Sequence, residues 1–305
     1  MSESVLKVIF IGLDNSGKTS ILYILEGKFA QIASLKPTIR FTRTDFNILG
    51  LPIKIWDLGG QEQYRSEYLG REQYFRGTDV LYYIIDIQDS KRFTESVEYF
   101  LSILEVFEKI NPEKYPYIQV FLHKYDPYLK GFPEMTEKVS TLKSLFAELS
   151  KTVNFTFFET TIYNFEEVSR AFVAGILKVL PKGEVIQEVL RDFMKKTESS
   201  AIMLLDENVL LIAEAFKDEQ SRNVCRICGP YFANMAERLR EYDLFAPDTI
   251  EVEMKGQWLF FKHIDHLKTG FYLIFFTKNK ENFTRINELL PVFTKDIVNL
   301  ITYIL

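Results

Sequence analysis

Residues 12–19 read GLDNSGKT, and this octapeptide constrains the fold more than any other part of the chain. It lies between the apolar runs VLKVIFI and SILYIL, so it joins a predicted strand to a predicted helix. Glycines let the backbone curl until successive N–H groups point inward, and the helix N-terminus adds further free N–H groups. The pattern G-x-x-x-x-G-K-[ST] in this context predicts a phosphate-binding loop.

The side chains of this loop indicate how phosphate and metal would be held. Lys18 would neutralise the β and γ phosphates, and the Thr19 hydroxyl would ligate Mg²⁺, a hard ion that prefers oxygen. The other nucleotide contacts that we expect from this loop are Asp14, Asn15, Ser16, Gly17 and Ser20.

The stretch WDLGGQ, residues 56–61, supplies the second half of the expected phosphate site. Asp57 ends an apolar strand, where its carboxylate suits Mg²⁺ binding. Gly60 lacks a side chain, so its N–H can approach a γ-phosphate, and the Gln61 carboxamide can orient an attacking water. Thr38, in LKPTIRF between the two motifs, is expected to complete the Mg²⁺ and γ-phosphate contacts. A plain turn is the alternative for the glycine pair alone.

A base-recognition site is predicted at VFLHKYDP, residues 120–127. A carboxylate can accept hydrogen bonds from both N1–H and the exocyclic amino group of guanine, whereas adenine offers no matching pair of donors. Asp126 is the candidate reader, with the Lys124 stem packing over the base. An ATPase is therefore disfavoured. A surface ion pair at the strand end is the competing interpretation of the motif alone.

The order of strand and helix signals divides the chain into two parts. Through residue 181, buried strands alternate with helices, which predicts a mostly parallel six-stranded sheet with helices on both faces; residues 39–58 read as an antiparallel hairpin. Pro181 and Gly183 mark a boundary. Residues 182–305 then read helix, two strands, helix, three strands, helix, which predicts an α+β domain with a five-stranded antiparallel sheet.

Composition excludes several classes of protein. A net charge of −5 argues against wholesale nucleic-acid binding. No apolar segment approaches the ~20 residues that a membrane span needs, so we expect no direct membrane insertion. Cys225 and Cys228, the only cysteines, lie in a predicted helix, which favours buried thiols in a reducing compartment over a disulfide or zinc site. His263 and His266 are expected to be structural.

Together these motifs resemble those of small GTPases. GLDNSGKT and WDLGGQ look like the Arf and Rag/Gtr members, and ETTIYN (159–164) looks like their last base-contacting loop, in which Thr161 and Ile162 match residues that meet the guanine oxygen. His123, where most small GTPases have Asn, makes HKYD similar to Rag/Gtr proteins. The second half is similar in element order to the roadblock domain of that family. The resemblance implies a P-loop GTPase domain at 1–181 and a roadblock-like dimerisation domain at 182–305.

The resulting hypothesis is a GTP-hydrolysing molecular switch that uses Mg²⁺ and recruits partners according to nucleotide state. The resemblance implies a homo- or heterodimer, activating and exchange proteins or scaffolds, and a cytoplasmic location with any membrane association through partners. Arg40, Arg43 and Arg65 are expected to be solvated rather than to act as arginine fingers, so intrinsic turnover should be slow. The alternative is a nucleotide-occupied scaffold whose hydrolysis is incidental.

Overall fold

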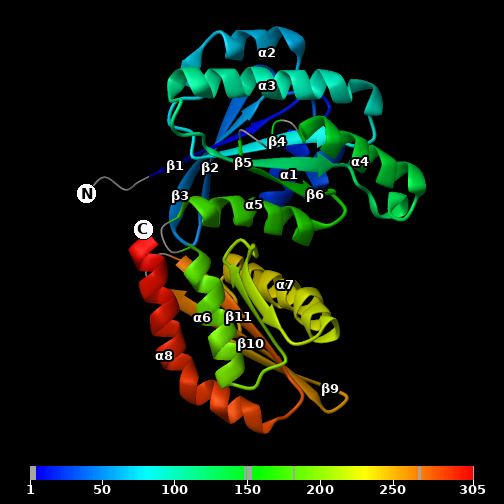
Figure 1. Ribbon diagram of the computed structural model, residues 1–305. Helices are drawn as coiled ribbons and strands as arrows, with labels where there is room; N and C mark the ends of the chain where they lie inside the picture. Colours follow the sequence, from blue (N-terminus) through cyan, green and yellow to red (C-terminus); the bar gives the residue numbers. More distant parts are fainter. Residues whose placement is uncertain (1–4, 148, 150–152, 181–182, 267–268, 305) are drawn as a thin grey trace. The chain divides into compact units, whose positions relative to one another are not determined.

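A computed structural model describes residues 5–147, 149, 153–180, 183–266 and 269–304. Apart from the first few residues, the chain divides into two compact units. One consists of residues 4–46 and 52–179, and the other of residues 180–305 with the short segment 47–51. Each unit has its own sheet (Figure 1).

The first unit is built on a six-stranded sheet with the order β2-β3-β1-β4-β5-β6. The pairs β1–β3, β1–β4, β4–β5 and β5–β6 are parallel. Leu49 and Gly50 join β2 to β3 with positive φ values of 51° and 81°, the backbone of a tight hairpin turn. The strands are β1 (Leu6–Ile11), β2 (Phe41–Ile48), β3 (Leu51–Leu58), β4 (Val80–Asp86), β5 (Tyr117–His123) and β6 (Phe155–Glu159).

Helices cover both faces of this sheet (Figure 1). The α-helices are α1 (Lys18–Leu25), α2 (Glu62–Leu69), α3 (Phe93–Ile110), α4 (Pro133–Phe146) and α5 (Phe165–Val179). The short 3-10 helices are η1 (Phe29–Ser34), η2 (Glu72–Tyr74), η3 (Ser90–Arg92) and η4 (Pro127–Leu129).

Alternate residues of the central strands face opposite sides. Ile9 and Tyr83 lie in one apolar cluster with residues of α3 and α4. Phe10 and Tyr82 point the other way, where both rings contact Phe172 of α5. Because both faces are covered, the strands are apolar throughout, as expected of a parallel sheet.

The second unit has a five-stranded sheet with the order β8-β7-β11-β10-β9. The pairs β7–β8, β7–β11, β10–β11 and β9–β10 are all antiparallel. Its strands are β7 (Ala201–Asp206), β8 (Leu211–Phe216), β9 (Thr249–Met254), β10 (Gln257–His266) and β11 (Thr269–Thr277). Its helices are α6 (Gly183–Lys196), α7 (Glu219–Glu241) and α8 (Glu281–Ile304).

Helix α7 covers one face of the second sheet, and α6 and α8 lie together against the other (Figure 1). Cys225 of α7 is buried in the apolar cluster beneath that helix, while Cys228 is half-buried. Burial raises the pKa of the Cys225 thiol, which therefore stays protonated. Among the described residues no three His, Cys, Asp or Glu side chains are grouped to hold a metal ion. Both cysteines lie on α7 without a disulfide between them, and His263 is a buried strand residue.

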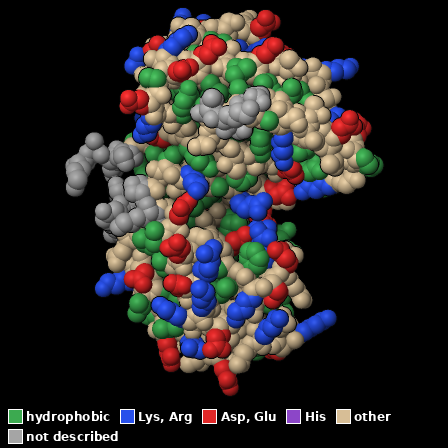
Figure 2. All heavy atoms as spheres, viewed as in Figure 1, with side chains coloured by type: hydrophobic (Ala, Val, Ile, Leu, Met, Phe, Trp, Pro, Cys, Tyr) green, Lys and Arg blue, Asp and Glu red, His purple; other side chains and the backbone are tan. Residues whose placement is uncertain are grey.

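The predicted fold class is confirmed in both parts: a mostly parallel six-stranded sheet is followed by an antiparallel five-stranded one. The proposed boundary at residues 181 and 182 lies outside the described residues; the compact units divide between Val179 and Leu180. Within the described part of the chain, no helix has the length and apolarity to cross a membrane. Figure 2 shows basic and acidic side chains interspersed on one face, in keeping with the net charge of −5.

A buried carboxyl group stands at the turn between β7 and β8. Asp206 is fully buried, and its Oδ1 accepts hydrogen bonds from the N–H groups of Asn208 and Leu210 at 3.0 and 2.8 Å. Burial outweighs these hydrogen bonds and raises the pKa of Asp206 to about 7. The folded unit therefore holds a proton that the unfolded chain releases near its ordinary pKa.

We predict that this group makes the second unit less stable as pH rises. Between about pH 4 and about pH 7 the folded form binds more protons, so the free energy of unfolding falls by at most about 4 kcal/mol and then levels off. In Asp206→Asn this fall should be absent. Urea unfolding at several pH values would measure this free energy. In a Trp56→Phe background the fluorescence of Trp258 reports on the unfolding of the second unit alone. An equal pH dependence in both proteins would contradict the prediction.

Candidate functional site

The loop between β1 and α1 surrounds a buried lysine. Gly17 precedes α1 with φ 93°, and no side chain caps the helix, so its first N–H groups stay available to an anion. The Lys18 side chain is buried, and its Nζ donates to the carbonyls of Gly12 and Leu13 at 3.2 and 2.7 Å. Burial lowers the pKa of Lys18 to about 8, against the opposing attraction of Asp57.

Three oxygen ligands from separate segments meet beside this lysine. The Thr19 hydroxyl donates to Asp57 Oδ2 at 2.6 Å and lies 2.8 Å from the Thr38 hydroxyl, which is itself 3.2 Å from Asp57 Oδ2. Asp57 is 1% exposed; burial raises its pKa, and its Oδ1 has no hydrogen-bond partner. Hydroxyl and carboxylate oxygens with one such orphaned atom fit a hard divalent cation.

The turn after β3 packs directly on the phosphate loop. A Cβ atom on Gly60 would lie 2.2 Å from both Asp14 N and Leu13 C, so only glycine fits here. Asp14 N–H donates to the Gly60 carbonyl at 3.1 Å. Gln61 follows as the residue before α2, and its side-chain Oε1 is buried without a partner. This carboxamide therefore keeps an unsatisfied acceptor in the structure.

These segments enclose one cavity of about 280 Å³. It brings together nearly all the residues predicted from the two phosphate motifs, while Asp57 lies buried behind the two threonines. The lining residues are Asp14, Asn15, Gly17, Lys18, Thr19, Ser20, Leu35, Lys36, Pro37, Thr38, Gly59, Gly60 and Gln61. Ser16, predicted with them, is buried and its hydroxyl is 3.3 Å from Lys18 Nζ.

The predicted base-recognition residues form a second cluster beside this cavity. Asp126 follows β5, and its Oδ1 accepts from the Thr161 hydroxyl at 2.6 Å. Lys124 pairs with Asp86 at 2.7 Å, which fixes its long side chain at the strand ends. Ile162 is half-buried next to Thr161. The carboxylate and the lysine stem are therefore held at the same edge of the sheet.

His123 connects the two clusters. Its ring lies against the phosphate loop, since a Cβ on Gly17 would be 2.4 Å from the imidazole Cδ2. Its Nδ1 is 3.0 Å from the Thr160 hydroxyl, in the loop that also carries Thr161. Burial lowers the pKa of His123 to about 3, so the ring is neutral. The histidine thus braces both loops by packing and one hydrogen bond.

Sequence reasoning missed two partners of Asp126. Gln88 Nε2 and the Tyr128 hydroxyl both donate to Asp126 Oδ2, at 3.0 and 3.2 Å. Gln88 lies just beyond the carboxyl end of β4, where parallel strands bring polar residues together, so its position was a usable signal. Tyr128 lies only two residues from Asp126, in HKYDPY.

One expectation about the arginines was wrong. Arg40 is exposed and Arg43 lies over the Trp56 ring on an exposed strand position, but the Arg65 side chain is only 12% exposed. Its Nη2 donates to Glu95 at 2.6 Å, a pairing across 30 residues that local sequence does not indicate.

Comparisons with known proteins agree with this geometry. The family model "Gtr1/RagA G protein conserved region" matches residues 7–237. GTP-binding protein gtr1 of Schizosaccharomyces pombe is 27% identical over 222 residues, covering 70% of each chain. ADP-ribosylation factor-like protein 3 of Chlamydomonas reinhardtii is 37% identical over 142 residues, 46% of this chain and 73% of that protein.

A solved structure is also similar. That of the Arl6 small GTPase from Trypanosoma brucei has a TM-score of 0.47 and 21% identity, and covers 58% of this chain and 98% of that one. The family match extends over more than half of the 305 residues and past the first unit. The chain therefore belongs to the Gtr1/RagA G protein family and is a small GTPase of the Rag/Gtr type.

Proposed function

We propose that the cavity beside Lys18 holds the phosphates of GTP or GDP and that Asp126 reads the guanine base. The observation that carries this proposal is the convergence of the phosphate loop, Thr38 and the Gly60–Gln61 turn on one cavity. The adjoining base cluster supports it, because His123 packs against Gly17.

Magnesium fits the three oxygens of Thr19, Thr38 and Asp57. When bound there, the ion would supply charge neutralisation beside the phosphates. Lys18 would add a second positive charge, and the Gly60 backbone would approach the γ-phosphate closely. Gln61 would orient water for in-line attack. Loss of the γ-phosphate would then release the segments that carry Thr38 and Gly60.

We predict that Lys18→Ala abolishes tight nucleotide binding. Lys18 is the buried lysine of the phosphate loop, and the change removes its positive charge from beside the phosphates. Titration with fluorescent GDP and GTP would measure a loss of affinity of roughly a hundredfold or more. Lys54→Ala, on an exposed position of β3, is the matched control and should bind normally. Unchanged affinity in Lys18→Ala would refute the proposed phosphate site.

We predict that Gln61→Leu retains nucleotide binding but slows single-turnover GTP hydrolysis by roughly a hundredfold, since leucine cannot orient water. Gln63→Leu, on an exposed position of α2, should hydrolyse GTP at the wild-type rate. Phosphate release with and without a candidate activating protein would also test the scaffold alternative. That alternative gains support if wild type and Gln61→Leu release phosphate equally slowly in both conditions.

We also propose that the second unit binds a partner through β9 and α7. β9 is an edge strand whose backbone can pair with another strand. Ile250, Val252 and Met254 of β9 pack in the cluster that also contains residues of α7, so these side chains point to the face of the sheet that α7 covers. On α7, Ile227, Tyr231 and Met235 are exposed at intervals of four residues. The exposed stripe and the open edge strand each offer a surface for dimerisation.

The charges of β9 favour a partner other than a second copy. Suppose that β9 of two copies pair antiparallel about Val252, with both α7 helices on the same face of the joined sheet. Glu251 of each copy then lies opposite Glu253 of the other. A shift of the centre to Glu251 or Glu253 places that residue opposite its own copy. Directly opposed like charges destabilise a pair of strands by roughly 0.2–1 kcal/mol each. We therefore expect a heterodimer whose partner strand carries basic residues. We also propose a cytoplasmic setting, with any membrane association through partners.

We predict that charge reversal creates a pair from two copies of this chain. Wild type alone and Glu251→Lys/Glu253→Lys alone should both sediment as monomers, because each opposes like charges. An equimolar mixture should form mixed dimers, in which Lys faces Glu. A stable dimer of the wild type alone would exclude this arrangement, and a mixture that stays monomeric would exclude pairing through β9.

A further inference from the structure

A ring of ion pairs links the phosphate loop to helix α2. Arg92 Nη2 donates to Asp14 Oδ1 at 2.7 Å, and Arg92 Nε donates to Glu95 Oε2 at 2.8 Å. Arg65 Nη2 donates to Glu95 Oε1 at 2.6 Å. The Asp14 N–H bond to the Gly60 carbonyl at 3.1 Å closes the ring, since the chain runs from Gly60 directly into α2.

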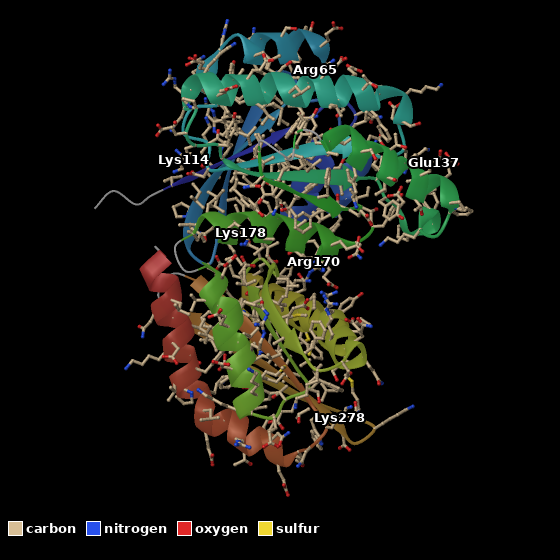
Figure 3. The ribbon with its side chains drawn as sticks, viewed as in Figure 1. Arg65, Lys114, Glu137, Arg170, Lys178 and Lys278 are labelled. Carbon is tan, nitrogen blue, oxygen red and sulfur yellow. The ribbon has the colours of Figure 1, made fainter. Side chains whose placement is uncertain are left out.

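The Arg65 end of this ring differs from ordinary surface ion pairs, which contribute little because both partners are solvated. The Arg92, Glu95 and Asp14 side chains are 31%, 40% and 42% exposed. Arg65 is mostly buried, and its guanidinium also lies over the Tyr99 ring at 5.1 Å. Figure 3 shows Arg65 where α2 runs beside α3. Glu95 accepts hydrogen bonds from both Arg92 and Arg65, and these bonds lower its pKa to about 2. The carboxylate is therefore charged at any physiological pH.

Helix α2 has few buried anchors, so this ring contributes to its position. Tyr64 and Leu69 are only partly buried against the core. Tyr68 is the only buried residue of α2, and the Tyr68 hydroxyl donates to the Arg40 carbonyl. Helix α3, in contrast, is anchored by nine buried residues, including Phe93 and Phe100. Glu95 therefore presents a fixed carboxylate, and Arg65 fastens α2 to it.

The position of α2 matters for the cavity. Gln61 is the residue immediately before α2, and Asp14 lines the same cavity from the phosphate loop. Arg92 connects the phosphate loop to α3, since it pairs with both Asp14 and Glu95. A shift of α2 relative to Asp14 would therefore move the Gln61 carboxamide away from the phosphates.

We propose that Glu95 and Arg65 are positioning residues for GTP hydrolysis, which hold α2, and with it Gln61, in register with the phosphate loop. This inference rests on the proposed function of the cavity. Neither residue lines the cavity, so their loss should slow hydrolysis without weakening nucleotide binding.

The test is single-turnover GTP hydrolysis at saturating nucleotide. Glu95→Ala and Arg65→Ala should each hydrolyse GTP roughly tenfold more slowly, because a small misplacement of a catalytic group is costly. The hydrolysis rate of the double variant should be no lower than that of either single variant, since both changes break the same link. Nucleotide affinity should equal that of wild type. Glu98→Ala, on an exposed position of the same helix, is the matched control and should behave as wild type.

Each other outcome overturns the inference. A wild-type rate in Glu95→Ala shows that the link is dispensable, and additive losses in the double variant show that the two residues act separately. Weaker binding with an unchanged saturated rate shows a role in affinity. If one single variant unfolds, the other carries the test. A wild-type protein that binds no GTP would instead refute the proposed function itself.

Discussion

Two opposite charges buried at one edge of a sheet govern the rest of this site. Lys18 and Asp57 are 5% and 1% exposed. Burial lowers the pKa of the lysine and raises that of the aspartate, so each would be costly alone. Loop carbonyls satisfy the ammonium group and two threonine hydroxyls satisfy one carboxylate oxygen. An anion beside the lysine and a cation beside the carboxylate would relieve what remains. These two buried charges are the physical basis of the proposed phosphate and magnesium sites.

The order of the strands explains why residues distant in sequence meet there. β1 lies between β3 and β4, and all three run parallel. Their carboxyl ends place the phosphate loop between Asp57, near the end of β3, and Asp86, at the end of β4. β5 follows and carries His123 to the same edge. A parallel sheet gathers its functional loops at one end, whatever their separation along the chain.

Local patterns were sufficient for the parts of the structure that are themselves local. The GLDNSGKT and WDLGGQ motifs predicted most of the residues that line the cavity, because strand, glycine turn and helix are read within a short window. Leu35, Lys36 and Pro37 also line it and were not predicted. Patterns of this kind also predicted both sheets. They did not predict that Arg65 pairs with Glu95 or that Gln88 binds Asp126, since these contacts depend on how elements pack. An arginine on a polar helix gives no signal of a distant carboxylate.

The contrast between α2 and α3 explains how one domain can be stable and still respond to a ligand. α3 buries nine residues in the core, so its position is set by apolar packing that no nucleotide changes. α2 fully buries only Tyr68, packs Tyr64 and Leu69 partly against the core, and is tied to α3 by Arg65. A link of this kind can be broken and remade without repacking the core. Under the proposed function, the segment that follows Gln61 is therefore the part of this edge whose position a γ-phosphate would select.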